Sequence, residues 1–233
     1  MTCVLMCGPT SVCPWCYIGK RHLEAALADF EHRDEVEIVY HSFELDPSAP
    51  QVPVETTVEA LAKKFGASVD QARELMKQAN VPAAAAGLEF RHDDTPHART
   101  IDAHRLLHLA KAEGKQAALK EELLAAYFSR GESMGDHTVL RQAAVSVGIG
   151  VGRADEVLAS DEFAGDVQAD IDQARAYGAT GVPFYVVEGQ YGVSGAQPTE
   201  LFAQLLEKVY AETKPALTII GDGDACGPEG CAI

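Results

Sequence analysis

Two cysteines separated by a proline and a tryptophan, Cys13-Pro14-Trp15-Cys16, constrain this chain more than any other feature. Pro14 suits the first position of a helix, where its missing N–H removes no hydrogen bond. A cysteine at a helix N-terminus has a lowered pKa, because unpaired N–H groups and the positive end of the dipole stabilise the thiolate. Apolar residues follow at the spacing of one helix face, at Leu23, Ala26, Leu27 and Phe30. The motif therefore predicts a dithiol suited to thiol–disulfide exchange, at the start of a helix over 14–32.

The first fifty residues are expected to fold as strand, helix and strand. A weak strand is predicted from Cys3 to Met6, and a second from Val36 to Phe43. Apolar and polar residues alternate from Val36 to Tyr40, as in a half-buried strand. Leu45 to Pro53 contains three prolines, so we expect a loop that leads into a different part of the structure.

The pattern from about 56 to 177 is almost entirely helical. Four apolar stripes have the spacing of a helix face, and glycines fall between them, where helices are expected to stop. The stripes are Val58, Leu61, Ala62 and Phe65; Ala72, Leu75, Met76 and Ala79; Ala103, Leu106, Leu107 and Ala110; and Leu140, Ala143, Ala144 and Val147.

Strand patterns return after Tyr177. Strands are predicted from Val182 to Glu188 and from Tyr191 to Val193, joined by a hairpin turn at Gly189-Gln190. Pro198-Thr199 then opens a final helix. This order of elements predicts an α/β domain interrupted by an all-helical insertion.

Charge and composition exclude several classes of partner. The 35 acidic and 19 basic side chains give a net charge of -16, and no basic patch offsets it, so nucleic acid and anionic membranes are not expected partners. No apolar stretch approaches the roughly 20 residues that span a bilayer. The first twenty residues lack the pattern of a secretory signal, so a cytoplasmic location is expected. In a reducing compartment, the six cysteines indicate redox or metal chemistry rather than a structural disulfide framework.

Metal binding is the main alternative for the Cys13 and Cys16 pair. A structural zinc needs four ligands, usually from two such pairs. Cys3 and Cys7 lie nearby, but their spacing matches no common zinc or iron–sulfur site. We therefore favour redox chemistry and expect neither a metal nor a cofactor.

The second informative stretch is Thr180-Gly181-Val182-Pro183-Phe184. A proline that opens a strand lacks the N–H of the ladder, and taken alone it indicates only a strand entry. Together with the Cys13–Cys16 motif, this stretch resembles the thioredoxin superfamily. The resemblance implies that Val182-Pro183 is a cis peptide packed against the dithiol, with the backbone of Val182 pairing with a substrate chain.

Four blocks in the same order resemble, more narrowly, the FrnE branch of the DsbA-like family. They are Ser11 to Lys20, Asp102 to Leu106, Thr180 to Phe184 and Tyr191 to Pro198. This resemblance implies a thioredoxin fold with a large all-helical insertion, and thiol–disulfide oxidoreductase activity. It further implies that Cys13 is the nucleophile, that Cys16 is the resolving thiol, and that Pro14, Trp15, Val182 and Pro183 contact the substrate. The expected divisions are 1–52 and 178–214 for the two parts of the thioredoxin-like domain, 53–177 for the insertion and 215–233 for a flexible cysteine-containing tail.

Two departures from the family pattern stand out. Gly8-Pro9 would break a strand, which puts the pairing of the first strand in doubt. Arg99-Thr100 stands before the Asp102 block, where the family commonly has a polar residue such as asparagine, so any helix cap there passes to Thr100 or is uncertain.

Two further sets of residues have open roles. In one interpretation, His104 or Arg105 faces the cleft and tunes the thiolate or binds substrate, and His104 is taken as the substrate-binding candidate. In the other, Arg105 makes a structural ion pair and His104 is a partly buried helix residue. Cys226 and Cys231 form either an auxiliary redox pair that relays oxidising equivalents to Cys13, or incidental cysteines of a disordered tail.

The expected partners are protein or small-molecule thiol and disulfide substrates, and the chain is expected to be a monomer or a homodimer. The direction of reaction is open, with oxidative-stress and disulfide-isomerase roles among the possibilities. One alternative is a glutathione-dependent isomerase or kappa-type transferase, but these usually carry serine where this chain has Cys13. Another is a non-catalytic redox sensor or metal-binding thiol protein.

Overall fold

The computed structural model describes residues 2–6, 13–91 and 95–213 of the chain. In this part, the strands fall near the two ends of the sequence, and eight α-helices lie between the second and third strands. The large helical insertion is therefore present. The division of the chain at residues 53 and 177 stays a prediction.

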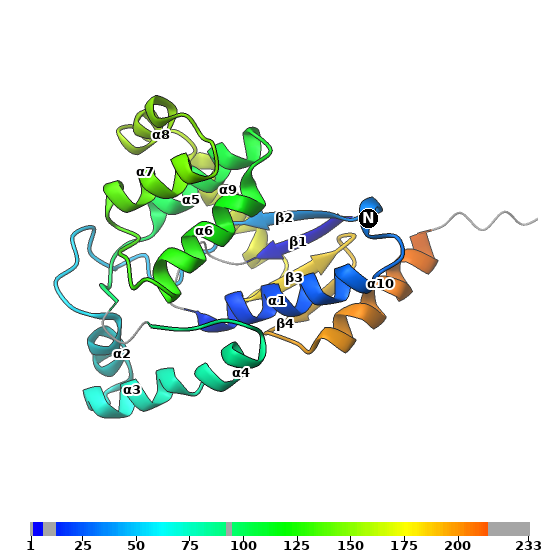
Figure 1. Ribbon diagram of the computed structural model, residues 1–233, viewed down its shortest axis with the longest axis horizontal. Helices are drawn as coiled ribbons and strands as arrows, with labels where there is room; N and C mark the ends of the chain where they lie inside the picture. Colours follow the sequence, from blue (N-terminus) through cyan, green and yellow to red (C-terminus); the bar gives the residue numbers. More distant parts are fainter. Residues whose placement is uncertain (1, 7–12, 92–94, 214–233) are drawn as a thin grey trace, which may run out of the picture.

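A four-stranded mixed sheet forms the centre of the thioredoxin-like part (Figure 1). The order in the sheet is β2-β1-β3-β4, with β1 parallel to β2 and antiparallel to β3. Val4 of β1 lies opposite Val39 on one side and Val186 on the other. The strands are β1 (Thr2–Met6), β2 (Glu37–His41), β3 (Phe184–Val187) and β4 (Tyr191–Ser194).

The first strand, predicted from Cys3 to Met6, is confirmed as β1. It ends at Met6, ahead of Gly8-Pro9, and pairs with both β2 and β3, which removes the doubt about its pairing. The hairpin turn is centred on Glu188-Gly189 rather than on Gly189-Gln190. Both central residues have positive φ (51° and 66°), and the N–H of Gln190 donates to the carbonyl oxygen of Val187 at 3.0 Å. This backbone matches the right-handed twist of the two strands, and glycine supplies one of the two left-handed positions.

Helices α1 (Pro14–Asp29) and α10 (Thr199–Thr213) lie side by side and share a core with the sheet (Figure 1). Leu23 and Phe30 pack there with Tyr185 of β3 and with Phe202 and Leu206 of α10. The helix predicted to reach residue 32 stops at Asp29. The backbone of the buried Phe30 is extended (φ -79°, ψ 125°) and turns the chain towards β2.

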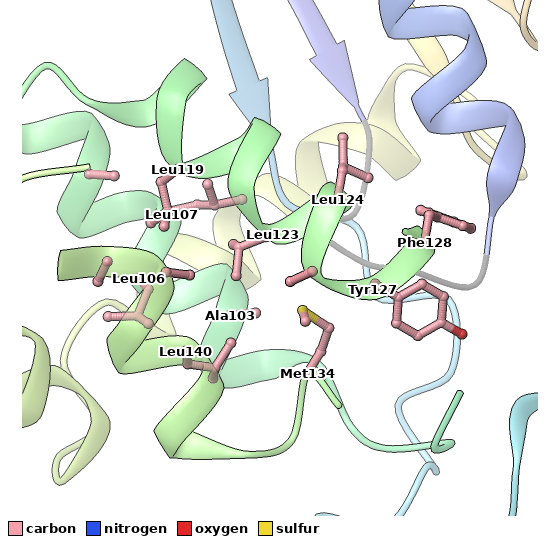
Figure 2. Close-up of a cluster of buried hydrophobic side chains, with 14 of the residues drawn as sticks. Ala103, Leu106, Leu107, Leu119, Leu123, Leu124, Tyr127, Phe128, Met134 and Leu140 are labelled. Carbon is pink, nitrogen blue, oxygen red and sulfur yellow. The ribbon is translucent and has the colours of Figure 1, made fainter. Parts of the chain in front are cut away.

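The helical part has its own core, built mainly from leucines of α5, α6 and α7 (Figure 2). The helices of this part are α2 (Thr57–Phe65), α3 (Val69–Lys77), α4 (Asn80–Ala85), α5 (Ile101–Ala112), α6 (Gln116–Phe128), α7 (His137–Ser146), α8 (Val151–Leu158) and α9 (Ala164–Ala176). The four predicted stripes lie on α2, α3, α5 and α7, and four further helices lie between or after them. Thr100 occupies the N-cap position of α5, but its side chain makes no capping hydrogen bond.

Helices α2 and α3 form a hairpin with a small core of its own. Val58 and Ala62 of α2 pack against Ala72 and Met76 of α3, apart from the leucine core. Capping boxes begin both helices, at Thr56 and Ser68, and satisfy the first backbone N–H groups of each. The hairpin lies beside the N-terminal end of α1 (Figure 1).

A polar network joins α1 to α6. Glu121 of α6 accepts hydrogen bonds from Lys20 (2.6 Å) and Tyr17 (2.6 Å), and also pairs with Arg21. Burial alone would raise the pKa of Glu121, but the hydrogen bonds from Lys20 and Tyr17 outweigh it and lower that pKa. Because the Lys20 side chain is only 4% exposed, its ammonium depends on Glu121 and on Glu24 of its own helix for charge compensation.

Asp170 of α9 makes a second connection between the two parts. It accepts a hydrogen bond from the backbone N–H of Ser42, after β2, at 2.6 Å and lies 3.1 Å from His108 Nε2 of α5. Burial opposes ionisation, but the hydrogen bonds with His108, His41 and Ser42 hold the pKa of Asp170 well below its usual range.

No helix within residues 2–6, 13–91 and 95–213 combines the length and the apolar character that crossing a membrane requires.

The fit of α1 against the sheet makes Gly19 sensitive to substitution. A Cβ at Gly19 would overlap the hydroxyl oxygen of the buried Tyr185 and lie 3.3 Å from the Cα of Ala196. We expect Gly19→Ala to lower the free energy of unfolding by about 1–3 kcal/mol, measured by urea denaturation. Gly152→Ala in α8 is the matched control, since nothing lies within 4 Å of its Cβ, and a gain of about 0.5–1 kcal/mol is expected. Equal effects at the two positions would contradict this account.

The polar network predicts a pH-dependent stability difference. Since the pKa of Glu121 is lower in the folded state than in the unfolded state, its contribution is present above the unfolded pKa and is lost as pH falls. We expect Glu121→Gln to cost about 1–3 kcal/mol at pH 7, with the difference from wild type shrinking below about pH 4. Denaturant titrations between pH 7 and pH 3 measure this difference.

Glu122→Gln serves as the control for that titration. Glu122 is about as exposed as Glu121, but its partner Arg130 is 42% exposed whereas Lys20 is 4% exposed. Such an exposed ion pair contributes about 1 kcal/mol or less. If the difference in unfolding free energy between wild type and Glu121→Gln stayed constant down to pH 3, the ionised network could not be its source.

Candidate active site

The two cysteines of the first motif lie in the first turn of α1. Cys13 is the N-cap residue and is partly exposed, while Cys16 is 1% exposed. The N–H of Cys16 donates to the carbonyl oxygen of Cys13 at 3.1 Å, and Pro14 begins the helix as predicted. The accessible sulfur therefore sits at the positive end of the helix dipole, with the second sulfur behind it.

Val182 and Pro183 lie opposite Cys13. Their peptide bond is cis, which confirms that prediction. The Cys13 thiol donates a hydrogen bond to the carbonyl oxygen of Val182, with a sulfur–oxygen distance of 3.2 Å. The fold thus brings together two stretches that are 169 residues apart in the sequence. Their contact with a substrate stays a prediction.

A cavity of about 630 Å³ opens at Cys13, Pro14 and Trp15. Its far wall comes from the helical part, chiefly from Leu61 and Phe65 of α2 and Leu75 and Met76 of α3. Phe65 is 59% exposed, Leu75 47% and Trp15 41%, so these large apolar side chains are open to solvent around the motif. The volume and the apolar walls suit a ligand of small-molecule size.

The last residues of α6 complete the cavity. Tyr127 and Phe128 line it and also belong to the leucine core, at whose edge they lie in Figure 2. The Tyr127 hydroxyl bonds to Thr57 Oγ1 of α2 at 2.8 Å. Burial raises the pKa of Tyr127, so it remains a neutral phenol that holds α2 in place.

The polar lining of the cavity is sparse. His97 Nε2 lies 3.2 Å from Asp46 Oδ2, and Asp46 also accepts hydrogen bonds from the backbone N–H and hydroxyl of Ser48. Burial opposes ionisation, but the bonds with Ser48 and His97 lower the pKa of Asp46. Lys64 of α2 is the remaining charged residue of the lining.

The sequence analysis did not identify this helical wall. Leu61, Phe65, Leu75 and Met76 belong to predicted apolar stripes, to which no role in the site was given. The core between α2 and α3 is formed by Val58, Ala62, Ala72 and Met76, with Leu61 packed against it. The available signal was therefore the surplus of apolar residues in the two stripes, which leaves Phe65 and Leu75 exposed.

His104 does not lie in the site, which corrects its assignment to substrate binding. Its side chain is 0% exposed, and Lys120, His108 and Asp170 are its charged neighbours. Burial and the charge of Lys120 lower its pKa well below the usual value. A side chain without accessible surface cannot contact a substrate.

The structural interpretation of Arg105 is confirmed. It pairs with Asp102 at 2.8 Å and donates to the carbonyl oxygens of Val157, Ser160 and Glu162 at the end of α8.

The structure does not describe the side chains of the other cysteines. Cys7, Cys226 and Cys231 lie outside the described residues, as does the side chain of Cys3. Within the described part of the chain, no three His, Cys, Asp or Glu side chains converge as metal ligands.

Comparison with known proteins identifies the family. The sequence pattern of the DSBA-like thioredoxin domain family matches residues 11–207. The crystal structure of a probable DsbA oxidoreductase, SCO1869 from Streptomyces coelicolor, is 42% identical with a TM-score of 0.86, over 100% of this chain and 99% of that chain. The uncharacterized protein YwbO of Bacillus subtilis (strain 168) is 26% identical over 209 residues, which cover 84% of this chain and 91% of that protein.

A more distant structure has the same fold. The cytosolic disulfide reductase DsbM from Pseudomonas aeruginosa, solved with GSH, is 16% identical with a TM-score of 0.62, over 90% of this chain and 100% of that chain. The narrower assignment to the FrnE branch stays a prediction. From its sequence match, its thioredoxin fold with a helical insertion, and the pairing of Cys13 with Val182, the chain belongs to the DSBA-like family of thiol–disulfide oxidoreductases.

Proposed function

We propose that this chain catalyses thiol–disulfide exchange through Cys13 and Cys16, with protein or small-molecule thiols as its substrates. The observation that supports this most directly is the Cys13 sulfur itself. It is partly exposed at a helix N-terminus, 3.2 Å from the Val182 carbonyl, and it lines the cavity.

The mechanism follows from the positions of the two sulfurs. In the reducing direction, the Cys13 thiolate attacks one sulfur of a substrate disulfide, and the other substrate sulfur leaves as a thiolate. Cys16 then loses its proton and attacks Cys13 Sγ, which releases the second substrate thiol and leaves a Cys13–Cys16 disulfide. Two electrons pass from the pair to the substrate, and the oxidising direction is the reverse. The burial of Cys16 favours Cys13 for the first attack.

Val182 has a part in both states of the cycle. Its carbonyl oxygen accepts a hydrogen bond from the Cys13 thiol in the structure. When the sulfur of Cys13 is bonded to a substrate, that donor is gone, and the carbonyl is free to accept an N–H from the substrate chain. We propose that this exchange positions the mixed disulfide for attack by Cys16.

The presence of two cysteines favours this function over the kappa-type alternative. A glutathione transferase needs only one group that activates the thiol of its cofactor, whereas Cys16 has a role only in resolving a mixed disulfide. The cytoplasmic location and the direction of the physiological reaction stay predictions.

The roles of the two cysteines are tested separately. We expect Cys13→Ser to abolish reduction of insulin disulfides by the chain in the presence of dithiothreitol. Cys16→Ala should form a mixed disulfide with substrate that persists on a non-reducing gel, because the attacking sulfur remains and the resolving one is gone. Full activity of Cys13→Ser would show that another cysteine carries the reaction. Absent turnover with tight zinc binding would instead favour the metal-binding alternative.

The tail cysteines are tested by a double substitution. If Cys226 and Cys231 relay oxidising equivalents, Cys226→Ser/Cys231→Ser should slow turnover of a disulfide substrate, while a single stoichiometric reaction at Cys13 keeps its wild-type rate. Comparing steady-state with single-turnover rates makes this distinction. A double variant as fast as wild type in both would exclude the relay.

A further inference from the structure

Two neighbouring lysines of α2 differ in whether they are paired with a carboxylate and in whether they line the cavity at Cys13. Lys63 pairs with Glu55 outside the cavity that reaches Cys13, whereas Lys64 lines that cavity. One turn before Lys64 on the same helix stand Ala60 and Leu61, which carry no charge. Among the described residues, no carboxylate is paired with Lys64.

The carboxylates of α3 and of the cavity lining are already engaged. Both acidic residues of α3 pair within their own helix, Asp70 with Arg73 at 3.1 Å and Glu74 with Lys77 at 2.9 Å. Asp46, across the cavity, bonds to Ser48 and His97. Among the described residues that line the cavity, Lys64 is therefore the one cation that is not paired with a carboxylate.

This local charge stands out against the rest of the molecule. A net charge of -16 repels anions in general, so an anionic substrate needs a local cation to approach. The cavity that Lys64 lines has mainly apolar walls, which include Leu61 and Phe65 of α2 and Phe128 of α6. Such a site suits a molecule with an apolar body and one negative end.

We propose that Lys64 binds the carboxylate of a small thiol or disulfide substrate, whose apolar body lies on α2 and α3 while its sulfur meets Cys13. The proposal rests on the proposed function and adds a substrate class to it. Lys64 acts as a specificity residue, because it selects the substrate without taking part in the exchange of sulfur.

The test compares disulfides that differ in charge. The probes are 3,3′-dithiodipropionate, which is anionic, bis(2-hydroxyethyl) disulfide, which is neutral, and cystamine, which is cationic. Each oxidises the reduced full-length chain, as Cys13 and Cys16 lose two electrons and two protons while the probe becomes two thiols. Trp15, the only tryptophan of the chain, lies between the two cysteines, so its fluorescence follows the oxidation of this pair.

The measured quantity is the rate constant for the anionic probe divided by that for the neutral probe. Dividing by the neutral probe removes any change in the reactivity of the Cys13 thiolate itself. We expect Lys64→Met to lower this ratio about 3- to 10-fold. Lys64→Glu should lower this ratio further and raise the rate constant for cystamine relative to that for the neutral probe. Lys64→Arg should keep the anionic-to-neutral ratio near its wild-type value.

Lys63→Met is the matched control, since it removes the same charge one residue away and outside the cavity. An unchanged ratio in this variant supports the proposal. Equal ratios in wild type and Lys64→Met, or an equal loss in Lys63→Met, would overturn it while leaving the proposed function intact. If none of the three probes oxidises the pair in the wild-type chain, both the substrate class and the proposed function fail.

Discussion

Helix α1 belongs to two hydrophobic cores at once, and the rest of the structure depends on this. Cys16, Leu23 and Ala26 pack with the sheet and α10, whereas Tyr17 and Ile18 pack with the leucines of the helical part. Neighbouring residues of a helix point about 100° apart, so one helix can serve two cores with successive side chains. The direction of α1 is therefore set from both sides, and with it the position of Cys13 at its first turn.

The site lies where these two parts meet. The thioredoxin-like part supplies the two sulfurs and the Val182 carbonyl, while α2, α3 and the end of α6 supply the wall of the cavity. Phe128 links the wall to the core, since it lines the cavity and packs with Tyr17. A substitution that shifts α6 relative to α1 is thus expected to change the cavity as well as the stability, with Glu121 as the polar contact between the two helices.

A helix or strand was predictable from the sequence where its residue pattern is compatible with only one type of secondary structure. The alternation from Val36 to Tyr40 predicted β2, and Pro14 with its apolar stripe predicted α1. The failures have a common cause. His104 shares its helix with Arg105, and only the packing of α5 against α6 and α9 decides that His104 is fully buried. The doubt about β1 came from Gly8-Pro9, but a strand is stabilised by its neighbours, and β1 has one on each side.

The sequence by itself determined the dithiol at a helix start, the helical insertion between two sets of strands, and through family resemblance the cis peptide at Val182-Pro183. These follow from residues close in the chain or from a recognisable order of motifs. Only the tertiary structure decided that Phe65, Leu75 and Lys64 face the cavity at Cys13, and that Lys63 does not. The physical reason is that periodicity identifies the apolar face of a helix or strand. Which residues that face contacts depends on how segments distant in the sequence pack together.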